Sequence, residues 1–247
     1  SDPNIKINFN YKCISANIEA GSVVFDNESK EIEVHNDAVF GTDGAFSKIR
    51  TAFQRRDGFS YSQEYIDHGY KELNIPPDSL GNFKMEKEAL HIWPRGGYML
   101  IALPNPDGSF TCTLFFPLKG ELSFNSLDSA VKAREFMNDI FPDALSLMED
   151  FDKQWELNPT SSLVIIKCKP WNVKGKSMLL GDASHAIVPF YGQGMNSGFE
   201  DCRVFDEILE KSEDLDEAFE SFSNTRKPDA DAISDLAMHN FIEMRDL

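Results

Sequence analysis

The sequence predicts a mixed α/β fold in which a cofactor-binding part and a sheet-bearing part are interwoven. Two short apolar runs end abruptly at Asp-Gly or Gly-Asp pairs, which is typical of buried strands that deliver a carboxylate to a ligand. The middle of the chain alternates apolar and polar residues, as half-buried strands do, and the last quarter has apolar residues at helical spacing. With 247 residues and no internal repeat, the chain can form one large domain or two joined domains.

Acidic residues outnumber basic residues by 41 to 24, which gives a formal net charge of -17. This charge argues against nucleic acid and anionic membrane surfaces as partners, and it mainly implies solubility. No apolar run reaches the roughly 18 residues that a membrane-spanning helix needs, and no targeting signal opens the chain. The four cysteines have no paired spacing, so we expect reduced thiols rather than a disulfide framework at Cys13, Cys112, Cys168 and Cys202.

The first part of the chain is expected to form short strands. Alternating apolar residues from Ile5 to Phe9 predict a half-buried strand. Residues 23–25 and 32–34 have the pattern of a hairpin that turns at residues 26–28. A further strand over residues 38–41 is apolar throughout and is therefore predicted to be buried.

That buried strand leads into Asp43-Gly44, where a carboxylate and a flexible glycine follow each other. Ser47 is placed to cap a short helix that carries Ile49, Arg50 and Phe53. Asp-Gly is also one of the commonest turn dipeptides, so the pair taken alone is better explained as a plain turn.

Residues 61–116 are predicted to form a sheet that offers a flat, mostly apolar wall. Residues 110–116 are rich in β-branched and aromatic side chains, and a cluster of turn residues over 104–109 precedes them. Apolar residues on such a wall belong to the core more often than they contact a ligand. The expected strands cover residues 65–73, 90–93, 98–103 and 110–116.

Helices are predicted to follow the sheet. Apolar spacing over residues 127–141 indicates an amphipathic helix that Ser126 caps and Pro142 ends. A weaker helical pattern covers residues 145–155, and an apolar strand is expected over 162–167.

The stretch from Ser177 to Asp201 is the one around which the chain is organised. Its apolar run stops at Gly181-Asp182, which places a carboxylate at a strand end. A loop with Pro189, Gly192 and Gly194 follows, and these residues let backbone approach a flat or charged ligand closely. A helix is expected to begin near Met195, with its free N–H groups and positive dipole end toward that loop. Together these features predict a cofactor site.

Three helices are expected after the glycine loop. The first covers residues 199–209, with Glu200 and Asp201 near its start as a solvated face that complements the dipole. The second covers residues 215–225 and the third residues 230–244, with a break near Pro228.

Metal and serine chemistry are weakly supported. His185 stands three residues after Asp182, but the other histidines lie in no ligand pattern, so His185 is more simply structural. Ser184 and Ser47 lack the G-x-S-x-G frame of a nucleophile. No metal ligand and no catalytic side chain is therefore assigned.

Several motifs resemble those of flavin-dependent aromatic hydroxylases. Residues 41–50 resemble the Asp-Gly motif of that family, and residues 180–189 resemble its Gly-Asp motif. Further stretches look specifically like the kynurenine 3-monooxygenase branch: residues 190–202, 91–95, 98–105, 109–115 and 232–245.

The resemblance implies an FAD-binding, Rossmann-like flavoprotein monooxygenase fold with an interwoven β-sheet substrate domain. It also implies that NADPH reduces FAD, that O₂ forms a flavin hydroperoxide, and that L-kynurenine is hydroxylated to 3-hydroxykynurenine. This is a step of tryptophan catabolism in the kynurenine pathway, which leads to NAD biosynthesis. The implied division assigns residues 1–60 and 166–211 to the FAD-binding domain, 61–165 to the substrate-binding sheet domain and 212–247 to C-terminal helices.

By the family pattern, Asp182 binds ribose or ribityl hydroxyls of FAD, and Met195 and Asn196 meet the isoalloxazine through backbone N–H groups. Asp43 serves a motif that bridges FAD and NADPH. The loop between flavin and substrate contains Pro189, Phe190, Gly192 and Gly194. The residues that the resemblance places around kynurenine are Asn240, Phe190, Phe115, Ile92 and Leu90.

The chain departs from the family at its start, because no G-x-G-x-x-G turn precedes Ile5. We expect these residues to be part of a longer polypeptide. A half that assembles with a second chain, or a stand-alone protein that has lost FAD binding, are the alternatives. An isolated chain of this sequence is accordingly expected to bind FAD poorly.

Two other functions stay open. One is another flavin aromatic hydroxylase with a different ring substrate, and the other is a non-catalytic module that binds ligand without turnover. The resemblance allows a homodimer. It implies a cytoplasmic location in a bacterium and the mitochondrial outer membrane in a eukaryote.

Overall fold

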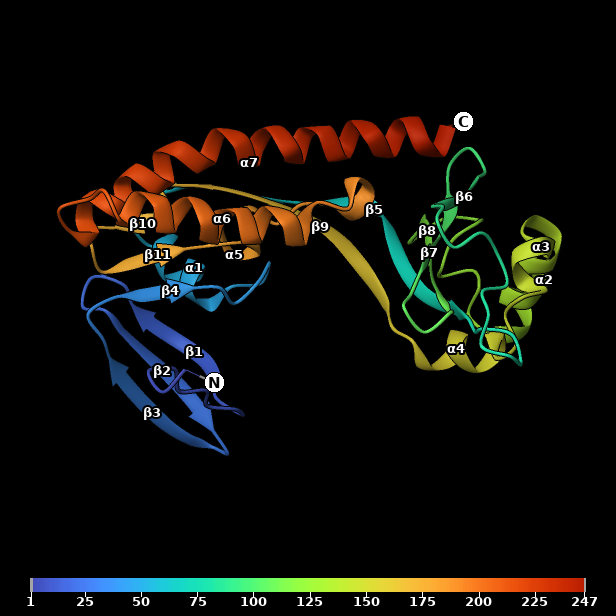
Figure 1. Ribbon diagram of the computed structural model, residues 1–247, viewed down its shortest axis with the longest axis horizontal. Helices are drawn as coiled ribbons and strands as arrows, with labels where there is room; N and C mark the ends of the chain where they lie inside the picture. Colours follow the sequence, from blue (N-terminus) through green and yellow to red (C-terminus); the bar gives the residue numbers. More distant parts are fainter. Residues whose placement is uncertain (1, 247) are drawn as a thin grey trace. The chain divides into compact units, whose positions relative to one another are not determined.

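The computed structural model describes residues 2–246 (Figure 1). The chain divides into two compact units. The first comprises Ser1–Glu64 and Val164–Met238, and the second comprises Tyr65–Leu163 and His239–Leu247. Because the chain passes from one unit to the other three times, the units are interwoven in sequence.

The first unit contains an antiparallel meander of β1 (Lys12–Asn17), β2 (Ser22–Asn27) and β3 (Lys30–His35). The predicted hairpin is confirmed as β2 and β3, and it turns at Glu28 and Ser29, both at positive φ.

The strand expected from Ile5 to Phe9 is wrong. The described chain has no strand there, and Ile5, Ile7 and Phe9 are 65%, 69% and 78% exposed. Alternation of apolar residues is not sufficient for a strand, because a strand also needs a neighbour to complete its backbone hydrogen bonds.

A second sheet in this unit carries the two carboxylate motifs. Its strands lie in the order β10 (Asn172–Val173), β11 (Ser177–Leu179), β4 (Val39–Gly41), and β11 runs parallel to β4. Parallel strands have their carboxyl ends at the same edge of a sheet, so the residues that follow β4 and β11 meet there.

Helices follow each of these strand ends. After β4, α1 (Lys48–Phe53) begins at Ser47, whose Oγ accepts a hydrogen bond from the Arg50 N–H at 2.8 Å, as predicted. After β11 come α5 (Asp182–His185), the 3₁₀ turn Pro189–Tyr191 and α6 (Gly194–Leu209).

The last helix differs from the prediction. Residues Leu215–Asp246 form one helix, α7, with Pro228 inside it, rather than two helices separated at that proline. Proline removes one backbone hydrogen bond and usually kinks a helix. Buried apolar side chains on both sides of it, among them Phe222 and Ala230, keep both parts of the helix packed.

The second unit contains most of a five-stranded sheet. Its strand order is β6 (His91–Pro94), β7 (Met99–Pro104), β8 (Phe110–Pro117), β5 (Ser60–Ile75), β9 (Thr160–Lys169). All four strands expected over residues 65–116 are therefore present, as is the strand expected over residues 162–167.

Three helices pack on the sheet of the second unit: α2 (Ala130–Ile140), α3 (Pro142–Leu145) and α4 (Phe151–Leu157) (Figure 1). Ser129 caps α2, rather than Ser126, which instead hydrogen-bonds to Ser123 in a turn before the helix. The helix expected over residues 145–155 is only partly present: residues 146–150 are not helical, and α4 begins at Phe151.

Gly41 lets α1 approach the parallel sheet closely. A Cβ at this position would lie 2.9 Å from side-chain atoms of Ile49 and 2.9 Å from Leu179. Ile49 and Leu179 are both buried, so neither side chain can turn away into solvent.

We expect Gly41→Ala to lower the free energy of unfolding by about 1–3 kcal/mol, because the added methyl overpacks this contact. Chemical denaturation measures the change. Gly97→Ala is the matched control, because a Cβ there meets nothing within 4 Å. Equal stability of the two variants would contradict the close packing at Gly41.

Candidate functional site

A hollow opens at the carboxyl end of the parallel strands of the first unit. It has a volume of about 350 Å³. A second hollow of about 500 Å³ shares Gly181, Asp182, Met195 and Gly198 with it, so the two are continuous. The structure thus brings five residues predicted for the cofactor site together around one space: Asp182, Pro189, Gly192, Gly194 and Met195.

Several residues around this space are glycines, so no side chain projects into it from those positions. A Cβ built at Gly44, Gly181, Gly192, Gly194 or Gly198 would meet no atom within 4 Å. Gly192 ends the 3₁₀ turn at φ 64°, in the left-handed region that favours glycine. The space in front of these residues can therefore hold a flat ligand against backbone.

Asp182 supplies the carboxylate of the site. It is the first residue of α5, and its side chain is accessible to solvent. The surrounding protein nevertheless raises the pKa of its carboxyl by desolvation, and His185 acts in the opposite direction. Because no hydrogen bond reaches this carboxylate from the described residues, it is available to accept from a ligand.

The N-terminus of α6 faces the same space. Its N-cap, Gln193, makes no side-chain capping bond, and the first N–H groups of a helix have no partner within the helix. These groups and the positive end of the helix dipole favour electron-rich or anionic groups of a ligand. Met195, in the first turn, is 73% exposed.

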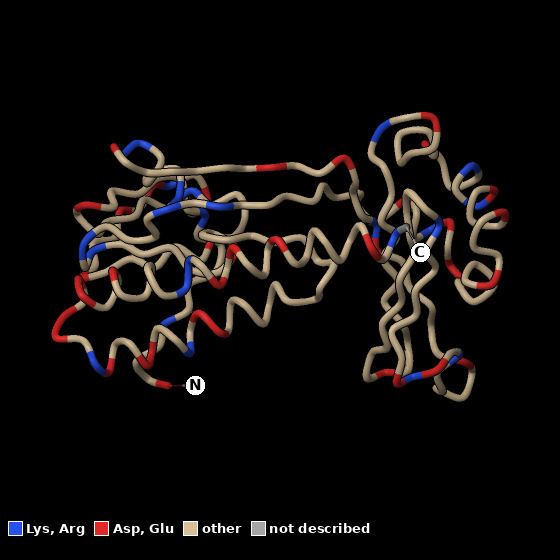
Figure 2. The backbone as a smooth tube through the Cα atoms, turned by 90° about the horizontal axis from the view of Figure 1, so that it is seen from above, with Lys and Arg blue, Asp and Glu red and all other residues tan. Residues whose placement is uncertain are grey.

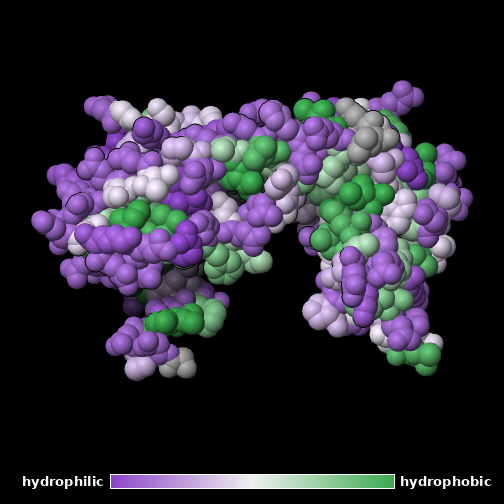
Figure 3. Space-filling model, turned by 45° about the horizontal axis from the view of Figure 1, so that its top comes forward, coloured by the Kyte–Doolittle hydropathy of each residue, from purple (hydrophilic) through white to green (hydrophobic). Residues whose placement is uncertain are grey.

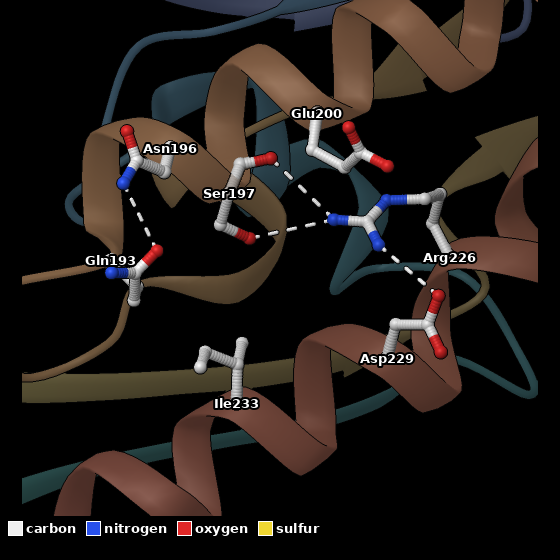
Figure 4. A pocket seen from close by; sticks show the side chains of 7 residues that line it. All are labelled: Gln193, Asn196, Ser197, Glu200, Arg226, Asp229 and Ile233. Atoms are coloured by element: carbon white, nitrogen blue, oxygen red, sulfur yellow. Dashed lines mark hydrogen bonds and ion pairs between the residues drawn. The ribbon is translucent and has the colours of Figure 1, made fainter. Parts of the chain in front are cut away.

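The side chain of Asn196 belongs to a different pocket (Figure 4). Its Nδ2 donates to Gln193 Oε1 at 3.0 Å. This pocket of about 330 Å³ lies between α6 and α7 and is lined by Gln193, Asn196, Ser197, Glu200, Arg226, Asp229 and Ile233. The side chain of Asn196 therefore lines the pocket between α6 and α7. Its backbone N–H belongs to the first turn of α6, which faces the hollow at Asp182.

Asp43 is engaged by its own loop. Its carboxylate accepts from Ser47 Oγ, from the Lys48 N–H at 2.6 Å and from the Ile49 N–H at 3.2 Å. It thereby caps α1, as a carboxylate at a helix N-terminus does. It lines a separate pocket with Phe40, Thr42 and other residues of the first unit.

The most important residue that the sequence did not reveal is Asp201. It was expected on a solvated face, but its side chain is completely buried and that expectation is wrong. Its carboxylate accepts from the Gly181 N–H at 2.9 Å, from His185 Nε2 at 2.6 Å and from Arg226 Nε at 3.0 Å. His185 thus has a structural partner within the fold.

One signal in the sequence could have indicated this. Ser197, Asp201 and Phe205 recur every four residues, so they share one face of α6. That face is the inner one, since Phe199 and Cys202 on another face are exposed. A carboxylate on the inner face of a helix must find donors, and only the fold shows that His185 and Arg226 provide them.

The pKa of Asp201 results from opposing effects. Burial alone would raise it, but the hydrogen bond and charge of His185, the Gly181 N–H and the charge of Arg226 hold it below the usual value. The ionised form is therefore the one that the fold requires.

The residues predicted for the substrate lie mainly in the second unit. Strand register puts Ile92 opposite Ile101 and Phe115 opposite Met99, on the sheet face away from α2–α4. Leu90 precedes β6 by one residue and is 49% exposed, Ile92 is 40% exposed, and Phe115 is buried. Asn240, on α7, donates to Met244 Sδ at 3.0 Å.

Phe190 is the exception, because it lies in the 3₁₀ turn of the first unit and is buried. Phe190 thus belongs to the first unit, whereas Leu90, Ile92 and Phe115 belong to the second.

No group of three or more His, Cys, Asp or Glu side chains in residues 2–246 is arranged to hold a metal ion. In the same part of the chain, no helix combines the length and apolar character needed to cross a membrane.

A prediction follows from the Asp201 pKa. Because the pKa of Asp201 is lower in the folded protein than in the unfolded chain, its ionised carboxylate stabilises the fold. This stabilisation is complete at pH values above the unfolded pKa of about 3.9, and it is lost as the pH falls through the folded pKa. We expect Asp201→Asn to be less stable than the wild type by about 3 kcal/mol near neutral pH, and the difference to shrink in acid. Denaturant unfolding across this range measures it.

Asp206→Asn is the control, because Asp206 lies on the same helix and is exposed. A constant difference between wild type and Asp201→Asn down to about pH 3 would contradict the prediction.

Comparison with known proteins gives relatives in sequence and in structure. No protein-family model matches the chain. It is 51% identical over 232 residues to kynurenine 3-monooxygenase of Myxococcus xanthus, which covers 90% of this chain and 50% of the relative. It is 45% identical over 256 residues to kynurenine 3-monooxygenase of Dictyostelium discoideum, covering 98% of this chain and 55% of the relative.

Solved structures share the fold at low identity. The tetrameric form of 2-methyl-3-hydroxypyridine-5-carboxylic acid oxygenase matches with a TM-score of 0.77 and 20% identity, over 95% of this chain and 60% of that one. Klebsiella pneumoniae HpxO, solved with FAD and uric acid, matches with a TM-score of 0.71 and 18% identity, over 93% and 57%. These matches confirm the predicted flavoprotein monooxygenase fold.

The chain spans about half the length of the curated relatives it matches. Relatives occur in a bacterium and in a eukaryote. Over nearly all of its own length, the chain is therefore similar to about half of the length of these kynurenine 3-monooxygenases, at 45% and 51% identity.

Proposed function

We propose that this chain is part of an FAD- and NADPH-dependent monooxygenase that hydroxylates L-kynurenine to 3-hydroxykynurenine with O₂. The observation that carries the proposal is the hollow at Asp182, where a carboxylate with no hydrogen bond from residues 2–246, several glycines and a helix N-terminus meet. The identity to kynurenine 3-monooxygenases supports the choice of substrate.

The residues at this hollow suit FAD chemically. Asp182 can accept hydrogen bonds from ribose or ribityl hydroxyls, because an ionised carboxylate is an acceptor only. The glycines at 192, 194 and 198 leave room for a flat ring, and the N–H groups at Met195 and Asn196 can donate to its electron-rich edge. Pro189 lines the adjoining part of the hollow, and the buried Phe190 follows it in the same 3₁₀ turn.

A bound flavin would supply hydride acceptance from NADPH and the activation of O₂. The chain's own residues would bind, orient and exclude water. The positive end of the α6 dipole would favour negative charge on the bound group. Asp43 would act indirectly in this scheme, by holding the loop before α1, because its carboxylate is already hydrogen-bonded.

The sheet face that carries Leu90, Ile92 and Phe115 is proposed as the apolar wall for the kynurenine ring, and Asn240 as a polar contact for its amino-acid end. Apolar walls with a small number of polar groups are typical of small-molecule sites. We further propose a homodimer, with a cytoplasmic location in a bacterium or the mitochondrial outer membrane in a eukaryote.

The substrate is tested by turnover of the full-length protein. Kynurenine should stimulate NADPH oxidation and yield 3-hydroxykynurenine, whereas 4-hydroxybenzoate and salicylate should not. Turnover of either of those acids would favour another aromatic hydroxylase. Kynurenine binding without NADPH oxidation would favour a non-catalytic module. Asn240→Ala should raise KM for kynurenine more than it lowers kcat, because it removes binding common to ground and transition states.

The control for Asn240→Ala is Asn224→Ala, at an exposed position of the same helix. An unchanged KM in Asn240→Ala would count against the proposed contact.

Asp182→Ala in the full-length protein should lose FAD during gel filtration, because the acceptor for the cofactor hydroxyls is removed. The flavin absorbance per protein measures the loss, and Asp206→Ala, an exposed aspartate on α6, serves as the control. Full retention of flavin in Asp182→Ala would exclude this role.

A further inference from the structure

Donors from three elements converge on the buried carboxylate of Asp201. The Gly181 N–H comes from the corner between β11 and α5, His185 Nε2 from the end of α5, and Arg226 Nε from α7. The side chains of His185 and Arg226 are 4% and 6% exposed, and that of Asp201 is fully buried. One carboxylate on α6 therefore connects three other segments of the first unit.

The geometry also fixes the proton on His185. The pKa of Asp201 is lowered, and an ionised carboxylate only accepts hydrogen bonds, so its 2.6 Å contact with His185 Nε2 requires a hydrogen on that nitrogen. The imidazole lies beside the buried ring of Trp171, with ring centroids 5.1 Å apart. His185 is thus held in both position and orientation.

Further hydrogen bonds hold the corner at residues 181–185, through its backbone carbonyl groups. The Gly181 carbonyl accepts from the Ser184 and His185 N–H groups at 2.8 and 3.0 Å, and Arg50 Nη1 donates to the Ala183 carbonyl at 2.7 Å. Gly181 itself has φ 57° and ψ -143°, a conformation that residues other than glycine rarely adopt. A corner of this shape depends on its hydrogen bonds.

Asp182 is the residue that this corner presents. It lies between Gly181 and Ala183, whose backbone groups are held by Asp201 and Arg50. Arg226 extends the connection to the first turn of α6, where Nη2 lies 3.5 Å from both the carbonyl and the Oγ of Ser197 (Figure 4). The carboxylate and the helix N-terminus of the hollow therefore share one buried anchor.

We propose that Asp201 is a positioning residue that holds the Gly181–His185 corner and the start of α6 in register, so that Asp182 and the helix N-terminus face the same ligand. The inference rests on the proposed FAD site for its functional meaning. The hydrogen bonds to Asp201 order this segment whether or not the cofactor binds, so that part of the inference does not depend on FAD.

Hydrogen exchange of the full chain, followed by mass spectrometry, tests the inference. In Asp201→Asn, amides of residues 181–197 should exchange about tenfold faster than in the wild type, because an amide cannot accept from all three donors. Asp206→Asn should match the wild type. FAD affinity of the full-length protein, measured in parallel, should fall in Asp201→Asn and not in Asp206→Asn.

A second pair of variants keeps the test decisive if Asp201→Asn does not fold. His185→Gln retains a donor near the position of Nε2, whereas His185→Leu has similar bulk and no donor. Fast exchange of residues 181–197 in His185→Leu, with near-normal exchange in His185→Gln, supports the anchor.

Equal exchange in the Leu and Gln variants, or acceleration spread evenly over the whole first unit, would overturn it. If exchange changes as expected but the wild-type full-length protein binds no FAD, the cofactor proposal fails and the positioning role survives.

Discussion

The buried carboxylate of Asp201 is the constraint on which the cofactor side of the molecule depends. Moving an ionised carboxylate out of water is costly, and the position is tolerable only because hydrogen bonds and a guanidinium compensate for the lost hydration. Those groups come from the end of β11, from α5 and from α7. The elements cannot shift independently without leaving a buried charge or donor unpaired, so the interaction holds the strand end, α5 and the first turn of α6 together.

Two carboxylates follow the parallel strands β4 and β11, and the fold gives them different tasks. The N-terminus of α1 saturates Asp43, which therefore orders its loop. Asp182 starts a helix of only four residues and keeps its oxygens open toward the hollow. The same residue type at equivalent strand ends thus becomes a cap in one case and a candidate ligand contact in the other.

The two units offer different surfaces. The first unit supplies the polar, glycine-lined hollow, and the second supplies a sheet face with exposed apolar side chains such as Leu90, Ile92 and Leu103. Apolar patches stand out among hydrophilic atoms on the visible surface (Figure 3). Acidic positions, in contrast, are spread over both units (Figure 2), which accords with a solvated surface rather than one charged binding face.

The sequence by itself determined the local elements and the cofactor stretch. Apolar periodicity located the sheet strands of the second unit and α6, and the run from Gly181 to Gly194 indicated a cofactor site, because strand ends, glycines and helix starts are local signals. Prediction from the sequence was wrong where the local structure depends on residues that are far away in the sequence. Ile5–Phe9 alternates as a strand does but has no strand neighbour, and Pro228 lies within a helix that packing maintains.

Asp201 shows the same limit most clearly. Acidic residues near a helix start are usually solvated, and nothing local distinguishes Asp201 from Glu200 beyond its helical face. Only the tertiary structure decided that His185, 16 residues before it, and Arg226, 25 residues after it, would surround its carboxylate. The physical reason is that a buried charge is stabilised by the partners that folding brings to it, and those partners are not neighbours in sequence.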